Sequence, residues 1–130
     1  MILRRAALEA VVAHAREAAP AECCGLLLGN GDTIAEAPRA RNLSPHLNRF
    51  LIDPKDHIDV RRDARGRGLD VVGFYHSHPH SAAAPSPTDV AEASYPDHVY
   101  LIVGLGEEEP AVRLYRIEAG RYCELTFNLL

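Results

Sequence analysis

Hydrophobic and polar residues recur along the chain with two periods, one typical of helices and one of strands. Between Arg4 and Ala19, apolar side chains fall on one face of a helix, and Pro20 ends the pattern. A second helix is predicted from Pro54 to about Arg65, because Asp53 can cap its first turn and glycines follow its end. A third, short helix is predicted between the Ser86 cap and Pro96.

The remaining apolar runs have the length and residue types of strands. Strands are predicted over Cys23–Leu28, Thr33–Arg41, Leu47–Ile52, Val71–His78, His98–Gly104, Ala111–Glu118 and Arg121–Leu125. A hairpin turn at 29–32 joins the first two. This order predicts an α+β fold with a single curved sheet, mixed or antiparallel, flanked by helices. Because no repeat or linker divides the chain, we expect residues 1–130 to form one domain.

The composition narrows the class of protein. Hydrophobic residues make up 47% of the chain and charged residues 25%, as in ordinary globular domains. A net charge of −4 with a single lysine gives no basic surface for nucleic acid, and no apolar run approaches the length of a membrane span. Three cysteines and no signal core argue against a disulfide-rich secreted protein. We therefore expect a cytoplasmic protein that binds neither nucleic acid nor membranes.

The first chemical signal is the pair His76 and His78 at the end of a predicted strand. Because side chains alternate along a strand, the two imidazoles share one face, and two neutral imidazoles on a rigid strand suit zinc. Pro79 ends the strand, so His78 lies at its tip, where a cleft can open. A His-x-His pair alone is a weak signal, because most histidines bind no metal.

Asp89 is the best candidate for a third ligand. It lies eleven residues after His78, in the first turn of the short helix, where the helix dipole favours a carboxylate. The spacing of Ser86 and Asp89 also fits a capping box, so the pair could be purely structural. Two other ligands are possible: His80 continues the alternation, and Cys24 could bind zinc, although its neighbours indicate a buried strand.

The combination of these residues resembles the signature of the JAMM (JAB/MPN+) metallopeptidases. His76-Ser77-His78, seven further residues and Ser86-Pro87-Thr88-Asp89 match the family pattern in order and spacing. Upstream, the run Glu22–Gly29 is similar to the family's glutamate-bearing strand, and Asn42–Asp56 and Pro96–Tyr100 resemble the small stand-alone bacterial members. The resemblance implies the JAB/MPN fold, a sandwich like that of cytidine deaminases.

The resemblance also implies a zinc-dependent peptidase or isopeptidase with one zinc per chain, held by His76, His78 and Asp89. Zinc lowers the pKa of a bound water from about 16 to about 7. In the family scheme Glu22 takes the proton of this water as general base without binding the metal, and Ser86 stabilises the oxyanion of the tetrahedral intermediate.

The implied substrates are amide bonds after the C-terminal Gly-Gly of ubiquitin or ubiquitin-like proteins. The chain has no room for the insertions with which larger members hold ubiquitin, so a bacterial sulfur-carrier protein of ubiquitin fold is the expected partner. We expect Asn42–Phe50 to line a groove for the extended tail. A linear peptide, an isopeptide and a carrier–amino-acid bond all stay open, as does the oligomeric state.

Two other functions share parts of this pattern. A metal-free or inactive MPN-type scaffold would bind proteins without hydrolysis, but such scaffolds lack one of the ligands or the glutamate, and all are present here. A zinc-dependent nucleoside deaminase would need His-x-Glu and Pro-Cys-x-x-Cys motifs, and neither occurs.

Overall fold

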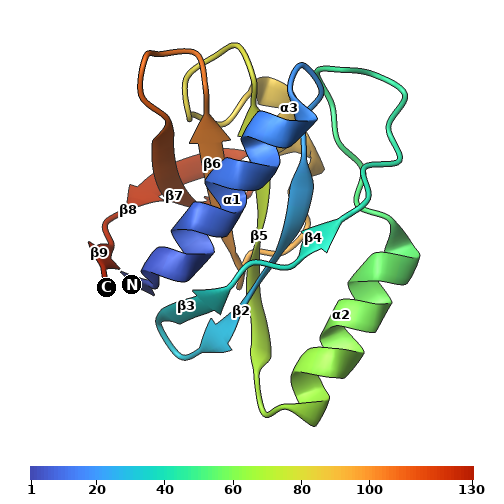
Figure 1. Cartoon of the computed structure of the whole chain (residues 1–130), viewed down its shortest axis with the longest axis vertical. Coiled ribbons are helices and arrows are strands. Elements are labelled where there is room, and N and C mark those ends of the chain that lie inside the picture. The colour runs from blue at the N-terminus through green and yellow to red at the C-terminus, as the bar shows by residue number, and fades with distance from the viewer.

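The computed structural model describes residues 1–130 and places three helices against one mixed sheet (Figure 1). The helices are α1 (Arg5–Ala18), α2 (Pro54–Gly66) and α3 (Pro87–Glu92). The strands are β1 (Ile2–Leu3), β2 (Cys24–Asn30), β3 (Thr33–Glu36), β4 (Arg39–Ala40), β5 (Asp70–His78), β6 (Val99–Gly104), β7 (Ala111–Glu118), β8 (Arg121–Leu125) and β9 (Asn128–Leu129). The predicted α+β class, with one sheet flanked by helices, is confirmed. None of the three helices combines the length and apolar character needed to cross a membrane.

The sheet has the strand order β8-β7-β6-β5-β2-β3-β1-β9, and β4 pairs with β2. β5 is antiparallel to β2 and parallel to β6, so α3 lies in the crossover between two parallel strands. Although β8 and β9 lie at opposite ends of this order, only Thr126 and Phe127 separate them in the chain. Three residue steps span at most about 11 Å, so the sheet curls until its two edges approach each other.

α1 covers one face of the sheet and lies in front of it in Figure 1. The face of α1 that carries Val11 and Ala15 packs against Leu27 of β2 and Leu101 of β6. These side chains are almost completely buried, so their removal from water stabilises the docking of α1, by about 1.5–3 kcal/mol for each large aliphatic side chain.

The opposite face buries a second cluster, which includes Phe74 of β5 and Ile102 of β6. Val60 of α2 and Val90 of α3 pack against this cluster. Side chains alternate along β5, so the side chains of Phe74, His76 and His78 share this second face. The histidine pair therefore lies on the side of the sheet where α2 and α3 pack.

The starts of α2 and α3 agree with the predicted caps. The Asp53 carboxylate accepts a hydrogen bond from the Lys55 amide at 2.9 Å, and Pro54 occupies the first turn. α3 ends at Glu92, earlier than the predicted end near Pro96, because the backbone is extended at residue 93. The amide of Tyr95 then donates to the Tyr100 hydroxyl instead of to the helix.

The predicted strand over Leu47–Ile52 is wrong. Only Ile52 makes a bridge, an isolated one with Asn42. The amide of Leu51 donates instead to the Asn42 side chain at 2.9 Å, so one side chain closes this segment into a loop.

The predicted return strand over Thr33–Arg41 is divided into β3 and β4. Pro38 lies between the two pieces and has no N–H to donate to a sheet. β1 and β9 were not predicted, because each has two residues and too short a pattern to detect.

Candidate metal centre

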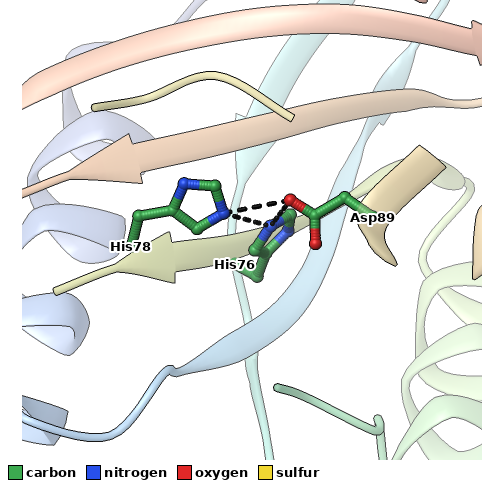
Figure 2. A group of neighbouring side chains, drawn as sticks. All are labelled: His76, His78 and Asp89. Atoms are coloured by element: carbon green, nitrogen blue, oxygen red, sulfur yellow. Dashed lines mark hydrogen bonds and ion pairs between the residues drawn. The ribbon is translucent and has the colours of Figure 1, made fainter. Parts of the chain in front are cut away.

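Three side chains with metal-binding atoms converge at the end of β5 (Figure 2). Nε2 of His76 lies 3.1 Å and Nε2 of His78 lies 3.0 Å from the same oxygen, Oδ2 of Asp89, and the two nitrogens are 3.2 Å apart. Two ligands on a tetrahedral zinc ion, with bonds of about 2.0 Å, are separated by about 3.3 Å. The two imidazoles and the carboxylate therefore fit a zinc site, both in chemistry and in spacing.

β5 gives the two histidines a rigid base. His76 is in register with Cys24 of β2 on one side and with Ile102 of β6 on the other. His78, the last residue of β5, is in register with Gly104. Hydrogen-bonded neighbours on both sides fix the backbone, so the direction of both imidazoles is set by the sheet.

α3 brings Asp89 to this pair. The Ser86 hydroxyl accepts from the Asp89 amide at 3.0 Å, and Oδ2 of Asp89 accepts from the Ser86 amide at 2.9 Å, so the capping box is present. The same Oδ2 faces both histidines. The structural and the metal-binding interpretations of Asp89 are therefore compatible, because one oxygen satisfies both geometries.

The tautomer of His78 is fixed by a backbone group. Its Nδ1 lies 2.9 Å from the carbonyl oxygen of Ala82. A carbonyl can only accept, so Nδ1 carries a hydrogen, and Nε2 is left as the ring nitrogen that faces Asp89 and can bind a metal. Such a partner on the other ring nitrogen is typical of histidines that bind metal.

The surroundings favour the metal-binding protonation states of two ligands. Burial lowers the pKa of His76, which is 2% exposed, and so keeps this imidazole neutral. Burial alone would raise the pKa of Asp89, but hydrogen bonds with His76 and His78 hold it well below its usual range. Burial also disfavours the charged form of His78, yet the hydrogen bonds to Asp89 and Ala82 raise its pKa overall. A neutral His76 and an ionised Asp89 are the forms that bind zinc.

Glu22 lies just before β2 and is buried, with 8% of its surface exposed. Its Oε1 atom has no hydrogen-bond partner. Burial raises the pKa of Glu22 to about 7; the nearby charge of His78 opposes this rise and the charge of Asp89 adds to it. A buried carboxyl group with a pKa near neutrality, in electrostatic contact with the ligand cluster, has the properties of a general base.

Ser86 lies half-buried at the start of α3. Its hydroxyl oxygen accepts from the Asp89 amide, and its hydrogen is given to no protein acceptor. The hydroxyl can therefore donate to a substrate while it still caps the helix.

The two alternative ligands lie outside the cluster. His80 is exposed in the turn after β5. The thiol of Cys24 faces the carbonyl oxygens of Ala40 and Arg41, and burial raises its pKa to about 12, so it stays protonated. Neither side chain joins the group formed by the histidine pair and the aspartate.

A cavity of about 640 Å³ opens beside the cluster. One wall is formed by residues 43–46 and 49–52, which overlap the segment Asn42–Phe50 expected to line a groove. The ring of Phe50 stacks on the imidazole of His76, with centroids 4.3 Å apart and planes inclined by 20°. Phe74 and Tyr95 also line the cavity, and no motif in the sequence marked them.

Comparison with known proteins agrees with this geometry. Residues 4–118 match the family described as prokaryotic homologs of the JAB domain. The chain belongs to this JAB family. It is a hydrolase of the JAMM type, as the resemblance predicted.

Two relatives of this JAB protein have named activities. It is 40% identical over 103 residues to the desampylase of Haloferax volcanii, with 74% of each chain covered. It is 31% identical over 133 aligned positions to the CysO-cysteine peptidase of Mycobacterium tuberculosis, with 100% of this chain and 91% of the relative covered.

The solution structure of DSY2949 from Desulfitobacterium hafniense has the same fold as this JAB protein. The two are 33% identical, with a TM-score of 0.91, and the match covers 100% of this chain and 93% of the other. The two proteins therefore share one fold along the matched residues.

Proposed function

We propose that this JAB protein is a zinc-dependent peptidase that hydrolyses the amide bond after the C-terminal Gly-Gly of a ubiquitin-like sulfur-carrier protein. The observation that carries the proposal is the convergence of His76, His78 and Asp89 next to the buried, unpartnered carboxyl group of Glu22. The names of the relatives, a desampylase and a CysO-cysteine peptidase, support a peptidase. The carrier class rests on the resemblance to small bacterial members.

In this proposal His76, His78 and Asp89 hold one zinc ion, a Lewis acid that makes water nucleophilic near neutral pH. Glu22 accepts a proton from the attacking water at Oε1, the atom that has no protein partner. It then returns this proton to the nitrogen of the leaving amine as the C–N bond breaks. The new carboxylic acid on the carrier then ionises, and the second proton of the water leaves on the amine, as ammonium, or passes to solvent.

Ser86 has the second role. Its free hydroxyl hydrogen donates to the substrate carbonyl oxygen as that oxygen gains negative charge. The cavity beside His76, with Phe50 on one wall, receives the residues next to the scissile bond and excludes water from them.

The direct test uses carrier proteins fused through Gly-Gly to a second protein, either linearly or through a lysine side chain. We expect cleavage that a chelator abolishes and added zinc restores. Glu22→Gln lowers the rate by about 100- to 10,000-fold, the usual contribution of a general base. Glu107→Gln, the same change at an exposed turn, leaves the rate unchanged. Cleavage that survives both chelation and Glu22→Gln contradicts the proposal, and purified protein without zinc would favour a scaffold.

A further inference from the structure

The peptide unit between Glu22 and Cys23 is held from both sides. The Glu22 carbonyl accepts a hydrogen bond from Nδ2 of Asn42 at 3.0 Å, and the Cys23 amide donates to Oγ of Ser77 at 2.8 Å. Both bonds act on one planar group. They therefore fix the rotation of this peptide, and with it the direction in which the Glu22 side chain leaves the backbone.

Ser77 connects this peptide to the metal centre. It lies between His76 and His78 on β5, is completely buried, and its side chain is on the face opposite to theirs. Its amide also donates to the Cys23 carbonyl at 3.1 Å. The strand that carries two of the proposed ligands thus also holds the backbone next to the proposed base.

Asn42 connects the same peptide to the loop 43–51. Its Nδ2 also donates to the Arg49 carbonyl at 3.1 Å, and its Oδ1 accepts from the amides of Ser44 and Leu51, both at 2.9 Å. All four hydrogen bonds that an asparagine side chain can make are formed. The bond to Ser44 is a local turn contact typical of Asn, and is the one part of this arrangement that the sequence could have indicated.

The Glu22 carboxyl group itself has no comparable support. Its Oε1 is buried without a partner, and no protein donor binds either of its oxygens. A side chain that is not held at its tip depends on its backbone for its direction. Asn42 and Ser77 supply that constraint.

We propose that Ser77 and Asn42 are positioning residues that set the direction of the Glu22 carboxylate through the Glu22–Cys23 peptide. The proposal rests on Glu22 acting as the base. Neither residue needs to touch the substrate for this role. A displacement of about 1 Å between reacting groups can lower a rate by about 100-fold, so loss of either bond should affect catalysis strongly.

Two pairs of variants test this role. Ser77→Ala removes the acceptor for the Cys23 amide, and we expect kcat to fall about 10- to 100-fold with KM unchanged, whereas Ser77→Thr keeps the hydroxyl and restores most of the rate. Asn42→Asp keeps the acceptor oxygen but loses the donor bonds to the carbonyl oxygens of Glu22 and Arg49. We expect kcat to fall by a similar factor. KM should also rise, because the loop 43–51 loses one of the hydrogen bonds that hold it. Asn48→Asp, the same change at an exposed position of this loop outside the cavity wall, leaves both parameters unchanged.

Zinc content and thermal unfolding are measured for every variant, and the expected result is a loss of kcat at one zinc per chain. The decisive test repeats Ser77→Ala and Asn42→Asp in the Glu22→Gln protein. If the two residues act through Glu22, each substitution should lower the residual rate of that protein by less than about twofold. If Glu22→Gln is fully active, the proposed function itself fails. If Glu22→Gln is impaired but the other two variants keep kcat, or lower it equally in both backgrounds, the positioning role is overturned.

Discussion

Gly104 and Ala83 approach each other so closely that a Cβ atom at residue 104 would lie 2.6 Å from the Ala83 amide nitrogen. The loop after β5 can rest on β6 only because residue 104 has no side chain. This packing holds the Ala82 carbonyl 2.9 Å from Nδ1 of His78. Gly104, a residue without a side chain, thus helps to orient His78, a proposed metal ligand.

The first prediction follows from this approach. Gly104→Ala pushes the 81–83 loop away and removes the acceptor of His78 Nδ1, and we expect zinc affinity to fall by about 10- to 100-fold, as when such partners are lost in other metal sites. Competition with a chromophoric chelator measures the affinity. Gly66→Ala is the control, because a Cβ there meets open space. Equal zinc affinities for the two variants would contradict the role of the Ala82 carbonyl.

The second prediction concerns stability and pH. Burial raises the pKa of Glu22 from 4.5 to about 7, so between these values the folded chain binds more protons than the unfolded chain. The free energy of unfolding contributed by Glu22 therefore decreases as pH rises through this window. We expect Glu22→Gln, measured by thermal unfolding after chelator treatment, to be more stable than wild type at pH 8.

Near pH 3 the two proteins should have nearly the same melting temperature, because Glu22 is then almost fully protonated in both the folded and the unfolded state. Glu107→Gln should show no such pH-dependent difference. A Glu22→Gln protein that is less stable than wild type at pH 8 would show that the carboxylate has partners and is not held unpaired.

The sequence predicted the parts of this protein that depend on near neighbours. The caps at Asp53 and Ser86 are local patterns, and both form. The convergence of His76, His78 and Asp89 follows from strand alternation and a helix start within a short stretch, and it was predicted together with the family. Their metal-binding role and the extent of the domain stay predictions.

The parts that the sequence did not reveal depend on distant partners. The Leu47–Ile52 segment has the residue types of a strand, but Asn42 satisfies its amide and turns it into a loop. The contact between Cys23 and Ser77 joins positions 54 residues apart, and no spacing rule indicates it. β1 and β9 exist because they pair with each other, far apart in the chain.

A third prediction separates the two roles of Ser86. Ser86→Ala removes the helix cap and the hydroxyl, and should lower stability by about 1 kcal/mol, whereas Ser86→Gly is a better cap and should lower it by only a few tenths. Both lose the oxyanion donor, so kcat should fall by about 100-fold or more in both. Denaturant unfolding and steady-state kinetics measure the two effects. If kcat falls in Ser86→Ala but is nearly kept in Ser86→Gly, as stability is, then Ser86 only caps the helix.

A fourth prediction concerns the cavity wall. Phe50→Ala removes the ring that stacks on His76 and lines the cavity, and we expect KM for a carrier fusion to rise by about tenfold with kcat little changed, since aromatic contacts contribute about 0.5–1.5 kcal/mol. Leu47→Ala is the matched control, because Leu47 lies in the same loop, is exposed, and is not part of the wall. If KM is unchanged in Phe50→Ala, the substrate does not occupy this cavity.

The three proposed ligands belong to residues 76–89, whereas the proposed base, Glu22, precedes β2 and lies more than fifty residues earlier in the chain. In the proposed mechanism, cation binding and proton transfer are thus encoded in separate stretches of the gene. A descendant of this chain could lose the proposed base through substitutions in the first stretch alone. By the same proposal, such a protein would still fold, bind its ion and act as an adaptor.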